Sequence, residues 1–169
     1  MLNIAVLGSS HVNRMNHDNE FLPGITFTRY FGKSGGRVEN MDQFMSELMC
    51  FDPALLILQI GGNDIHPNKS PEKIADDIFD LCHRLLCNIS SLRCVFVGAL
   101  FLRIRPRYLS SNQYEEQRRR VNECLQEKLC DTTVFWRHKR IAPSCLSADG
   151  VHLNVKGNTR LCTCLFAVQ

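Results

Sequence analysis

The sequence predicts an α/β fold in which helices cover both faces of a parallel sheet. Short apolar runs alternate with amphipathic stretches along the chain, and two of the runs are nearly continuous, as fully buried parallel strands are. No internal repeat, low-complexity tract or linker interrupts this alternation. The 169 residues fit a single domain over residues 1–169. A chain of this length can build a core without metal or disulfide staples.

Five apolar runs are the expected strands. They are Ile4 to Leu7, Ile25 to Phe31, Ala54 to Ile60, Val95 to Leu100 and Thr133 to Trp136. In an open parallel sheet the ligand site lies beyond the carboxyl ends of the strands. We therefore look for chemistry directly after each of these runs.

Apolar residues recur at helical spacing between the runs. The recurring sets are Val38, Met41, Met45 and Leu48; Ile74, Ile78, Leu81 and Leu85; Val121, Leu125 and Leu129; and a stretch from about Val155 to Leu165. Ser70 is a plausible N-cap with Pro71 in the first helical position. Ser110 is a second, with Gln113 as its capping partner. Strands and helices are expected to alternate, beginning with a strand and ending with a helix.

Composition excludes several classes of protein. A net charge of +3 is too small to argue for nucleic-acid binding. The nine cysteines include no Cys-x-x-Cys pair, which favours reduced, mostly buried thiols in a cytoplasmic, reducing environment and no disulfide or metal site. The N-terminus lacks the basic region and long apolar core of a signal peptide. No apolar run approaches the ~20 residues of a membrane helix.

A serine follows the first expected strand, and a carboxylate precedes a histidine near the end of the chain. Gly8 permits a sharp turn, so Ser10 would lie at the sheet edge near a helix N-terminus, whose N–H groups can stabilise an oxyanion. The carboxylate of Asp149 can reach Nδ1 of His152, fix its tautomer and leave Nε2 facing a nucleophile. The alternatives are an N-cap role for Ser9 or Ser10 and a solvated Asp–Gly turn.

Glycines and an asparagine follow the second and third expected strands. Gly32, Gly35 and Gly36 occur where glycine permits positive φ or a close approach of backbone to ligand. The amide of Asn63 can donate a hydrogen bond into the same cleft, and Asp64 can brace the loop that follows. An ordinary strand-to-helix turn remains the alternative for the glycine segment.

Together these residues offer a nucleophile, an oriented base and oxyanion donors in the chain order Ser, Asp, His. No Gly-x-Ser-x-Gly surrounds Ser10, so the nucleophile-elbow hydrolases are not the template. The sequence instead resembles the SGNH (GDSL-like) hydrolase superfamily. The segments that resemble its four blocks are Gly8-Ser9-Ser10, Gly35, Gly61-Gly62-Asn63-Asp64 and Asp149 to His152.

The resemblance spans nearly the whole chain and implies a three-layer flavodoxin-like fold, with a five-stranded parallel sheet in the order 2-1-3-4-5. It implies a serine esterase for carboxylic esters, with short-chain acyl or acetyl groups, that needs no cofactor. Ser10 would be the nucleophile, His152 the base and Asp149 its orienter. The backbone N–H groups of Ser10 and Gly35 and the side-chain amide of Asn63 would form the oxyanion hole. One departure is Ser9, which stands where the family usually has aspartate.

A narrower resemblance concerns three phrases of the sequence: Gly-Ser-Ser-His-Val, Gln-Ile-Gly-Gly-Asn-Asp and Asp-Gly-Val-His-Leu-Asn. They are similar to the esterase domain in the first open reading frame of some vertebrate non-LTR retrotransposons. The alternative function is a catalytically weak module that binds lipid or assembles within a nucleic-acid-binding protein, although the presence of all four blocks argues against it. A dinucleotide or flavin protein would need a Gly-x-Gly-x-x-Gly run after the first strand, which is missing.

Basic residues follow the fourth and fifth expected strands. They are Arg103, Arg105 and Arg107, and then Arg137, His138, Lys139 and Arg140. We expect either an anionic partner at this rim, lipid headgroups or nucleic-acid phosphates, or two solvated loops with no target. His11 follows Ser10 directly, so its side chain is expected to point elsewhere and to be structural. The oligomeric state is left open.

Overall fold

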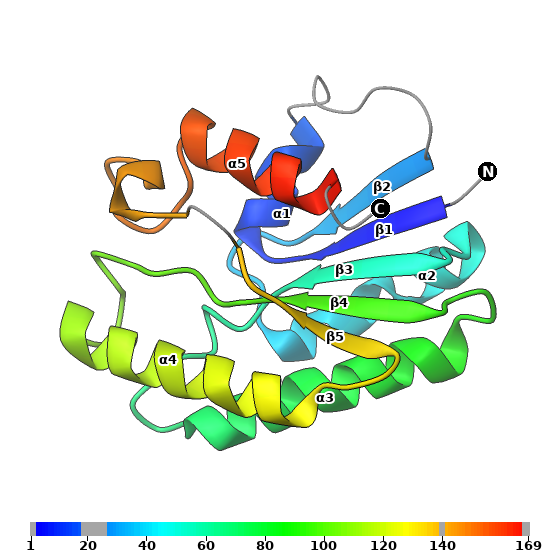
Figure 1. Cartoon of the computed structure of the whole chain (residues 1–169), viewed down its shortest axis with the longest axis horizontal. Coiled ribbons are helices and arrows are strands. Elements are labelled where there is room, and N and C mark those ends of the chain that lie inside the picture. Colours follow the sequence, from blue (N-terminus) through cyan, green and yellow to red (C-terminus); the bar gives the residue numbers. More distant parts are fainter. Residues whose placement is uncertain (1–2, 18–26, 139–140, 167–169) are drawn as a thin grey trace.

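The computed structural model describes residues 3–17, 27–138 and 141–166, with side chains except at 16–17 and 162–166. Five strands form one all-parallel sheet in the order β2-β1-β3-β4-β5, which confirms the expected topology (Figure 1). Their bounds are β1 (Asn3–Gly8), β2 (Phe27–Gly32), β3 (Leu55–Gln59), β4 (Cys94–Gly98) and β5 (Thr133–Trp136). The start of the second expected strand, at Ile25, lies outside the described residues.

Helices lie on both faces of the sheet. Helices α2, α3 and α4 cover one face, while α1 and α5 cover the other (Figure 1). The helical segments are α1 (Ser10–His17), η1 (Val38–Phe44), α2 (Met45–Phe51), α3 (Pro71–Asn88), α4 (Ser111–Lys128), η2 (Pro143–Cys145) and α5 (Val155–Phe166). The result is the three-layer α/β architecture that the sequence predicts.

One expected helix is divided in two. The spacing from Val38 to Leu48 predicts a continuous α-helix, but the structure has a 3₁₀ segment, η1, followed by the α-helix α2. The side chain of Asn40 accepts a hydrogen bond from the Arg37 backbone N–H at 2.9 Å and so holds the first turn of η1. Val38 and Met41, both buried, are three residues apart and therefore share one face of a three-residue turn.

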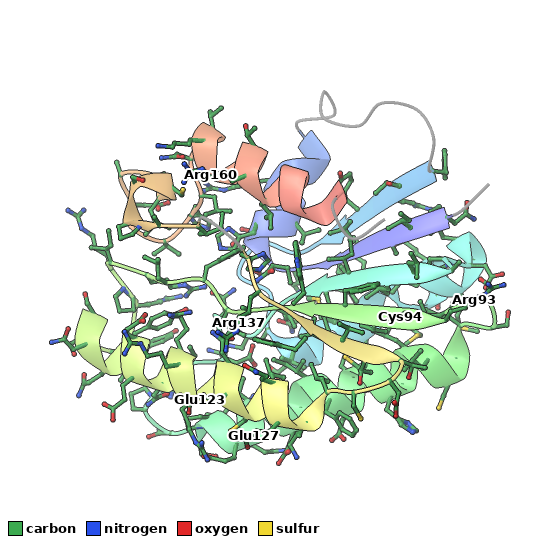
Figure 2. All side chains as sticks on the ribbon, viewed as in Figure 1. Arg93, Cys94, Glu123, Glu127, Arg137 and Arg160 are labelled. Carbon is green, nitrogen blue, oxygen red and sulfur yellow. The ribbon has the colours of Figure 1, made fainter. Side chains whose placement is uncertain are left out.

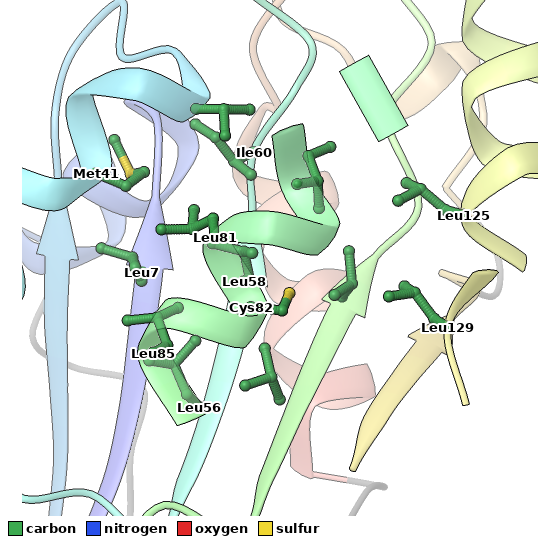
Figure 3. Close-up of a cluster of buried hydrophobic side chains, with 14 of the residues drawn as sticks. Leu7, Met41, Leu56, Leu58, Ile60, Leu81, Cys82, Leu85, Leu125 and Leu129 are labelled. Carbon is green, nitrogen blue, oxygen red and sulfur yellow. The ribbon is translucent and has the colours of Figure 1, made fainter. Parts of the chain in front are cut away.

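The core has two parts because alternate side chains of each strand point to opposite faces. Leu56 and Leu58 of β3 pack toward α3, together with Leu81 and Leu85 of that helix (Figure 3). Ile57 points to the other face, where α1 and α5 lie. Burial of each such aliphatic side chain contributes roughly 1.5–3 kcal/mol, so the nearly continuous apolar runs are explained by burial on both sides.

The two long helices begin where their caps predict. Ser70 precedes α3, and its hydroxyl accepts a hydrogen bond from the backbone N–H of Lys73 at 3.2 Å. Ser110 and Gln113 form a reciprocal capping box at the start of α4. These caps fix the point at which the chain leaves the carboxyl edge of the sheet and enters each helix.

None of the helices in the described ranges has the length and apolar character needed to cross a bilayer. The seven cysteines whose side chains are described form no disulfide with one another.

Candidate active site

Ser10 is positioned by a tight turn at the end of β1. Gly8 packs so closely on β3 that a Cβ atom there would lie 2.2 Å from the carbonyl oxygen of Gln59. The Ser9 backbone N–H donates to that same oxygen at 3.2 Å, which continues the sheet for one more residue. Ser10 then begins α1 and is buried. The first N–H groups of a helix have no partner inside it, so they are available at this point.

The histidine loop, residues 147–152, closes on itself through hydrogen bonds. Asp149 Oδ1 accepts from Ser147 Oγ at 2.7 Å and from the backbone N–H groups of Val151 and His152 at 2.9 Å each. Desolvation alone would raise the pKa of Asp149, but the hydrogen bonds from the backbone and ring of His152, from Ser147 and from Val151 outweigh it and hold the pKa well below its usual range. The carboxylate is therefore ionised at every pH at which the protein would work.

Three of the residues predicted from the sequence meet in one hydrogen-bonded chain. His152 Nδ1 lies 2.6 Å from Asp149 Oδ2, and His152 Nε2 lies 3.0 Å from Ser10 Oγ. An ionised carboxylate can only accept, so Nδ1 carries the proton and Nε2 of the neutral ring is an acceptor facing the Ser10 hydroxyl. This arrangement can remove a proton from Ser10.

Asn63 and the glycine segment form the opposite side of the site. Asn63 Nδ2 donates to the Gly36 carbonyl oxygen at 2.9 Å, and Asn63 Oδ1 accepts from Arg103 Nη2 at 2.9 Å. Because both the nitrogen and the oxygen of the Asn63 amide are hydrogen-bonded, the orientation of the amide is fixed. The second N–H of Nδ2 is left for another acceptor. Gly35 has a φ of 67°, and a Cβ there would meet nothing within 4 Å, so it borders open space. A Cβ at Gly32 would instead lie 2.2 Å from the Asn13 nitrogen of α1.

Asp64 braces this side of the site, as the sequence predicts. Its buried carboxylate accepts from the Val38 backbone N–H at 3.2 Å and from Lys69 Nζ at 3.2 Å. Burial raises the pKa of Asp64 despite these partners. The carboxylate thereby ties the segment after β2 to the loop after β3.

Two histidines, buried His11 and half-buried His138, lie beneath the site. The His11 ring is 4.9 Å from Phe101 and 5.6 Å from the ring of His152, as a packed structural residue would be. Burial, and secondarily the charge of Arg103, lowers the pKa of His11 to about 3. His138 Nε2 lies 2.8 Å from Gln59 Oε1, and burial lowers the pKa of His138 to about 4. Both rings are neutral near pH 7.

The expected basic rim is therefore smaller than the sequence indicates. His138 is half-buried and uncharged because its ring packs between Phe101 and Trp136, at centroid distances of 4.5 Å each. Arg137 turns toward α4, where it donates to Gln126 Oε1 at 2.5 Å. Lys139 and Arg140 lie outside the described residues. The three arginines after β4 remain beside the site.

Three residues shape the site through contacts that were not predicted from the sequence. They are Arg103, Gln59 and Ser147. In the sequence Arg103 is one of several loop arginines. Among the described side chains, it alone donates a hydrogen bond to Asn63. Gln59 carries no motif, although it bonds both His138 and the Ala99 carbonyl oxygen. A serine two residues before an aspartate is a signal for a local turn and could have identified Ser147. Within the described part of the chain, no group of three or more acidic, histidine or cysteine side chains has the arrangement of a metal site.

Comparison with known structures agrees with this architecture. Similar folds include a lipase/acylhydrolase from Enterococcus faecalis (14% identity, TM-score 0.71, 99% of this chain and 95% of that one). They also include a catalytic mutant of an acetylxylan esterase from Geobacillus stearothermophilus (13% identity, TM-score 0.66, 98% and 93%) and an acetyl esterase mutant with acetate ion (13% identity, TM-score 0.70, 99% and 96%). At these identities the likeness shows the fold alone. A search of curated protein sequences finds no significant match.

A family model provides the assignment. The model described as GDSL-like Lipase/Acylhydrolase matches residues 2–165, nearly the whole chain. The narrower similarity to retrotransposon esterase domains stays a prediction. The chain belongs to the GDSL-like lipase/acylhydrolase family and is, by class, a carboxylic ester hydrolase.

Proposed function

We propose that the protein is a serine esterase that uses Ser10, His152 and Asp149 to hydrolyse short-chain acyl esters. The observation that supports the proposal is the continuous hydrogen-bonded chain from Ser10 Oγ to His152 Nε2 at 3.0 Å and from His152 Nδ1 to Asp149 Oδ2 at 2.6 Å. Nucleophile, base and orienting carboxylate are the three parts that acyl transfer through a serine requires.

In the first half-reaction Ser10 Oγ attacks the ester carbonyl carbon while His152 Nε2 takes the hydroxyl proton. The negative charge on the carbonyl oxygen is met by the backbone N–H groups of Ser10 and Gly35 and by the free N–H of Asn63. His152 then gives its proton to the leaving alkoxide, which leaves an acyl group on Ser10. Water repeats the sequence, with His152 as base, and releases the carboxylic acid.

The small space around Ser10 favours short acyl groups. A hollow lined in part by Ser9 and His11, the two chain neighbours of Ser10, and by Phe101 has a volume of only about 10 Å³. A long acyl chain could not enter such a space without moving buried side chains.

The test is hydrolysis of 4-nitrophenyl acetate, butyrate and octanoate by the wild type and by Ser10→Ala. We expect turnover that falls with chain length and that drops by about 10³-fold or more in Ser10→Ala. Near-normal turnover by a folded Ser10→Ala variant would show that another group carries the reaction.

A second proposal concerns the surface beside the site and keeps the prediction of an anionic partner. Ile104 and Tyr108 are exposed large apolar side chains, 47% and 43% accessible, next to the exposed Arg105 and Arg107. Apolar and basic groups side by side favour contact with an anionic membrane surface, with about 1 kcal/mol for each basic residue. Co-sedimentation with anionic and neutral vesicles tests this, with Arg105→Gln and Arg107→Gln as the variants. Equal recovery on both vesicle types would remove the proposal.

A further inference from the structure

An open hollow of about 90 Å³ adjoins the proposed oxyanion donors. Gly35 and Asn63 form part of its wall, so a substrate whose carbonyl oxygen meets those donors reaches the hollow directly. The hollow is much larger than the one lined by Ser9, His11 and Phe101 and holds the volume of several water molecules.

The wall of the hollow is cationic. Arg37, Arg103 and Arg107 all contribute to it, and no carboxylate is among its lining residues. Asp64 follows Asn63 in the chain, and its charge interacts with that of Arg37. Its buried carboxylate is bound by Val38 and Lys69, however, and forms no part of the wall. Three guanidinium groups around one open space repel one another, and an anion placed among them would relieve that repulsion.

Two of the arginines are held in place by neighbouring rings. The guanidinium of Arg103 lies over Tyr114 at 5.4 Å and donates to Asn63, and that of Arg107 lies over Tyr108 at 5.3 Å. A guanidinium has five N–H donors in a rigid fork, so these contacts leave donors for a ligand. That fork matches the oxygens of a carboxylate or a phosphate, and stacking on a ring orients it before the ligand arrives.

We propose that this hollow, defined by Gly35, Asn63, Arg37, Arg103, Arg107 and Tyr108, binds an anionic group of the ester substrate. The substrate class is an ester that carries a carboxylate or phosphate group a few bonds from the scissile carbonyl. The proposal rests on the proposed serine esterase function and specifies the substrate of that site. Tyr108 and its apolar neighbours would contact the carbon spacer between the ester and the anion.

The test compares esters that differ only in charge. On the acyl side the pair is mono-4-nitrophenyl adipate and 4-nitrophenyl hexanoate. On the alcohol side methyl 4-acetoxybenzoate is compared with 4-acetoxybenzoate and with 4-acetoxyphenyl phosphate, which separates a carboxylate from a phosphate. We expect at least one anionic ester to exceed its neutral partner by about tenfold in kcat/KM at low salt, and the ratio to fall as salt rises.

Variants assign that preference to the hollow. In the double variant Arg37→Gln/Arg107→Gln the ratio of anionic to neutral kcat/KM should fall close to one. The control is Arg93→Gln, which removes one positive charge at the amino end of β4, far from Arg137 at the carboxyl end of β5 (Figure 2). This control should keep the ratio of the wild type.

A binding measurement separates failure of this proposal from failure of the esterase function. Titration of Ser10→Ala with adipate and with phenyl phosphate, followed by calorimetry, should show binding that the Arg37→Gln/Arg107→Gln substitutions abolish. Hydrolysis of neutral esters without any preference for anions, and without anion binding, would overturn the anionic site and leave the esterase intact. Arginine-dependent anion binding with no hydrolysis of any ester would leave the site and overturn the esterase.

Discussion

Two loops beside the proposed site are built differently. The histidine loop, residues 147–152, is closed by its own hydrogen bonds, including Ser147 N–H to the His152 carbonyl oxygen at 2.7 Å and Gly150 N–H to the Ser147 carbonyl oxygen at 3.0 Å. The arginine loop, residues 102–109, has no helix or strand and is anchored at a few points to other parts of the chain. Its Ile104 N–H donates to the Gly150 carbonyl oxygen at 2.8 Å, and Arg103 reaches Asn63.

This difference separates two tasks. The histidine loop contains its own bracing, so it can hold the Asp149 carboxylate and the His152 ring whatever substrate is bound. The arginine loop presents exposed side chains to whatever enters, and only Arg103 is drawn into the proposed oxyanion site. In the proposed mechanism, the chemistry common to all esters belongs to the self-braced histidine loop, and selection among esters belongs to the arginine loop.

The largest expected effect comes from breaking the histidine loop. His152→Ala should lower kcat/KM by about 10³-fold, and Asp149→Ala somewhat less, because without Asp149 the ring remains but loses its fixed tautomer. The measurement is steady-state hydrolysis of 4-nitrophenyl acetate. His83→Ala, at an exposed position on α3, is the matched control and should have the activity of the wild type.

On the opposite side the proposed donor is a single amide, so the expected effect is smaller. Asn63→Ala should lower kcat by roughly 10²-fold with little change in KM, because the amide acts mainly in the transition state. Separate determination of kcat and KM checks this. A variant in which KM alone rises would assign Asn63 to substrate binding instead.

Arg103 should act through Asn63, and the effect should be smaller again. Arg103→Met removes the bond that fixes the amide, so we expect kcat to fall about tenfold, as loss of one charged hydrogen bond implies. In a double-mutant cycle the same substitution in the Asn63→Ala background should have little further effect on kcat. Additive losses would show that Arg103 works independently of Asn63.

The last effect concerns the two histidines beneath the site, and it appears in stability and not in the rate of hydrolysis. His11 and His138 have pKa values of about 3 and about 4 in the folded protein, against an ordinary value of 6.5. Below pH 6.5 the unfolded chain takes up protons that the folded chain does not, so stability is present above pH 6.5 and is lost as the pH falls toward 4 and 3.

With two protons involved, the free energy of unfolding should fall by up to about 2.7 kcal/mol per pH unit. Urea unfolding between pH 7 and pH 4.5 measures this slope, and His138→Gln should roughly halve it. A free energy of unfolding that does not change over this range would mean that the two rings are not buried as neutral groups.

Short-range patterns explain most of what could be predicted from the sequence. The spacing of Asp149 and His152, the caps at Ser70 and Ser110 and the continuous apolar strands all depend on residues close together in the chain. Helix α1 was harder to predict because its first seven residues, Ser10 to Asn16, include only two apolar side chains, so no amphipathic stripe is visible.

Contacts between distant segments explain what was missed. His138 follows Trp136 and Arg137, so the sequence predicts that it belongs to a basic loop. Its hydrogen-bond partner, Gln59, is 79 residues away in the chain. Arg103 likewise bonds Asn63 from 40 residues away. Neither pairing leaves a periodic or local signal, because only the order of the strands brings these residues to the same edge of the sheet.

In the proposed mechanism Ser10 is the nucleophile and His152 activates it. The most direct measurement is reaction with a fluorophosphonate, followed by mass spectrometry of the intact protein and its peptides. We predict a single adduct on the peptide that contains Ser10, absent from Ser10→Ala and formed far more slowly by His152→Ala. An adduct on any other residue, or equal labelling of wild type and Ser10→Ala, would show that Ser10 is not the nucleophile.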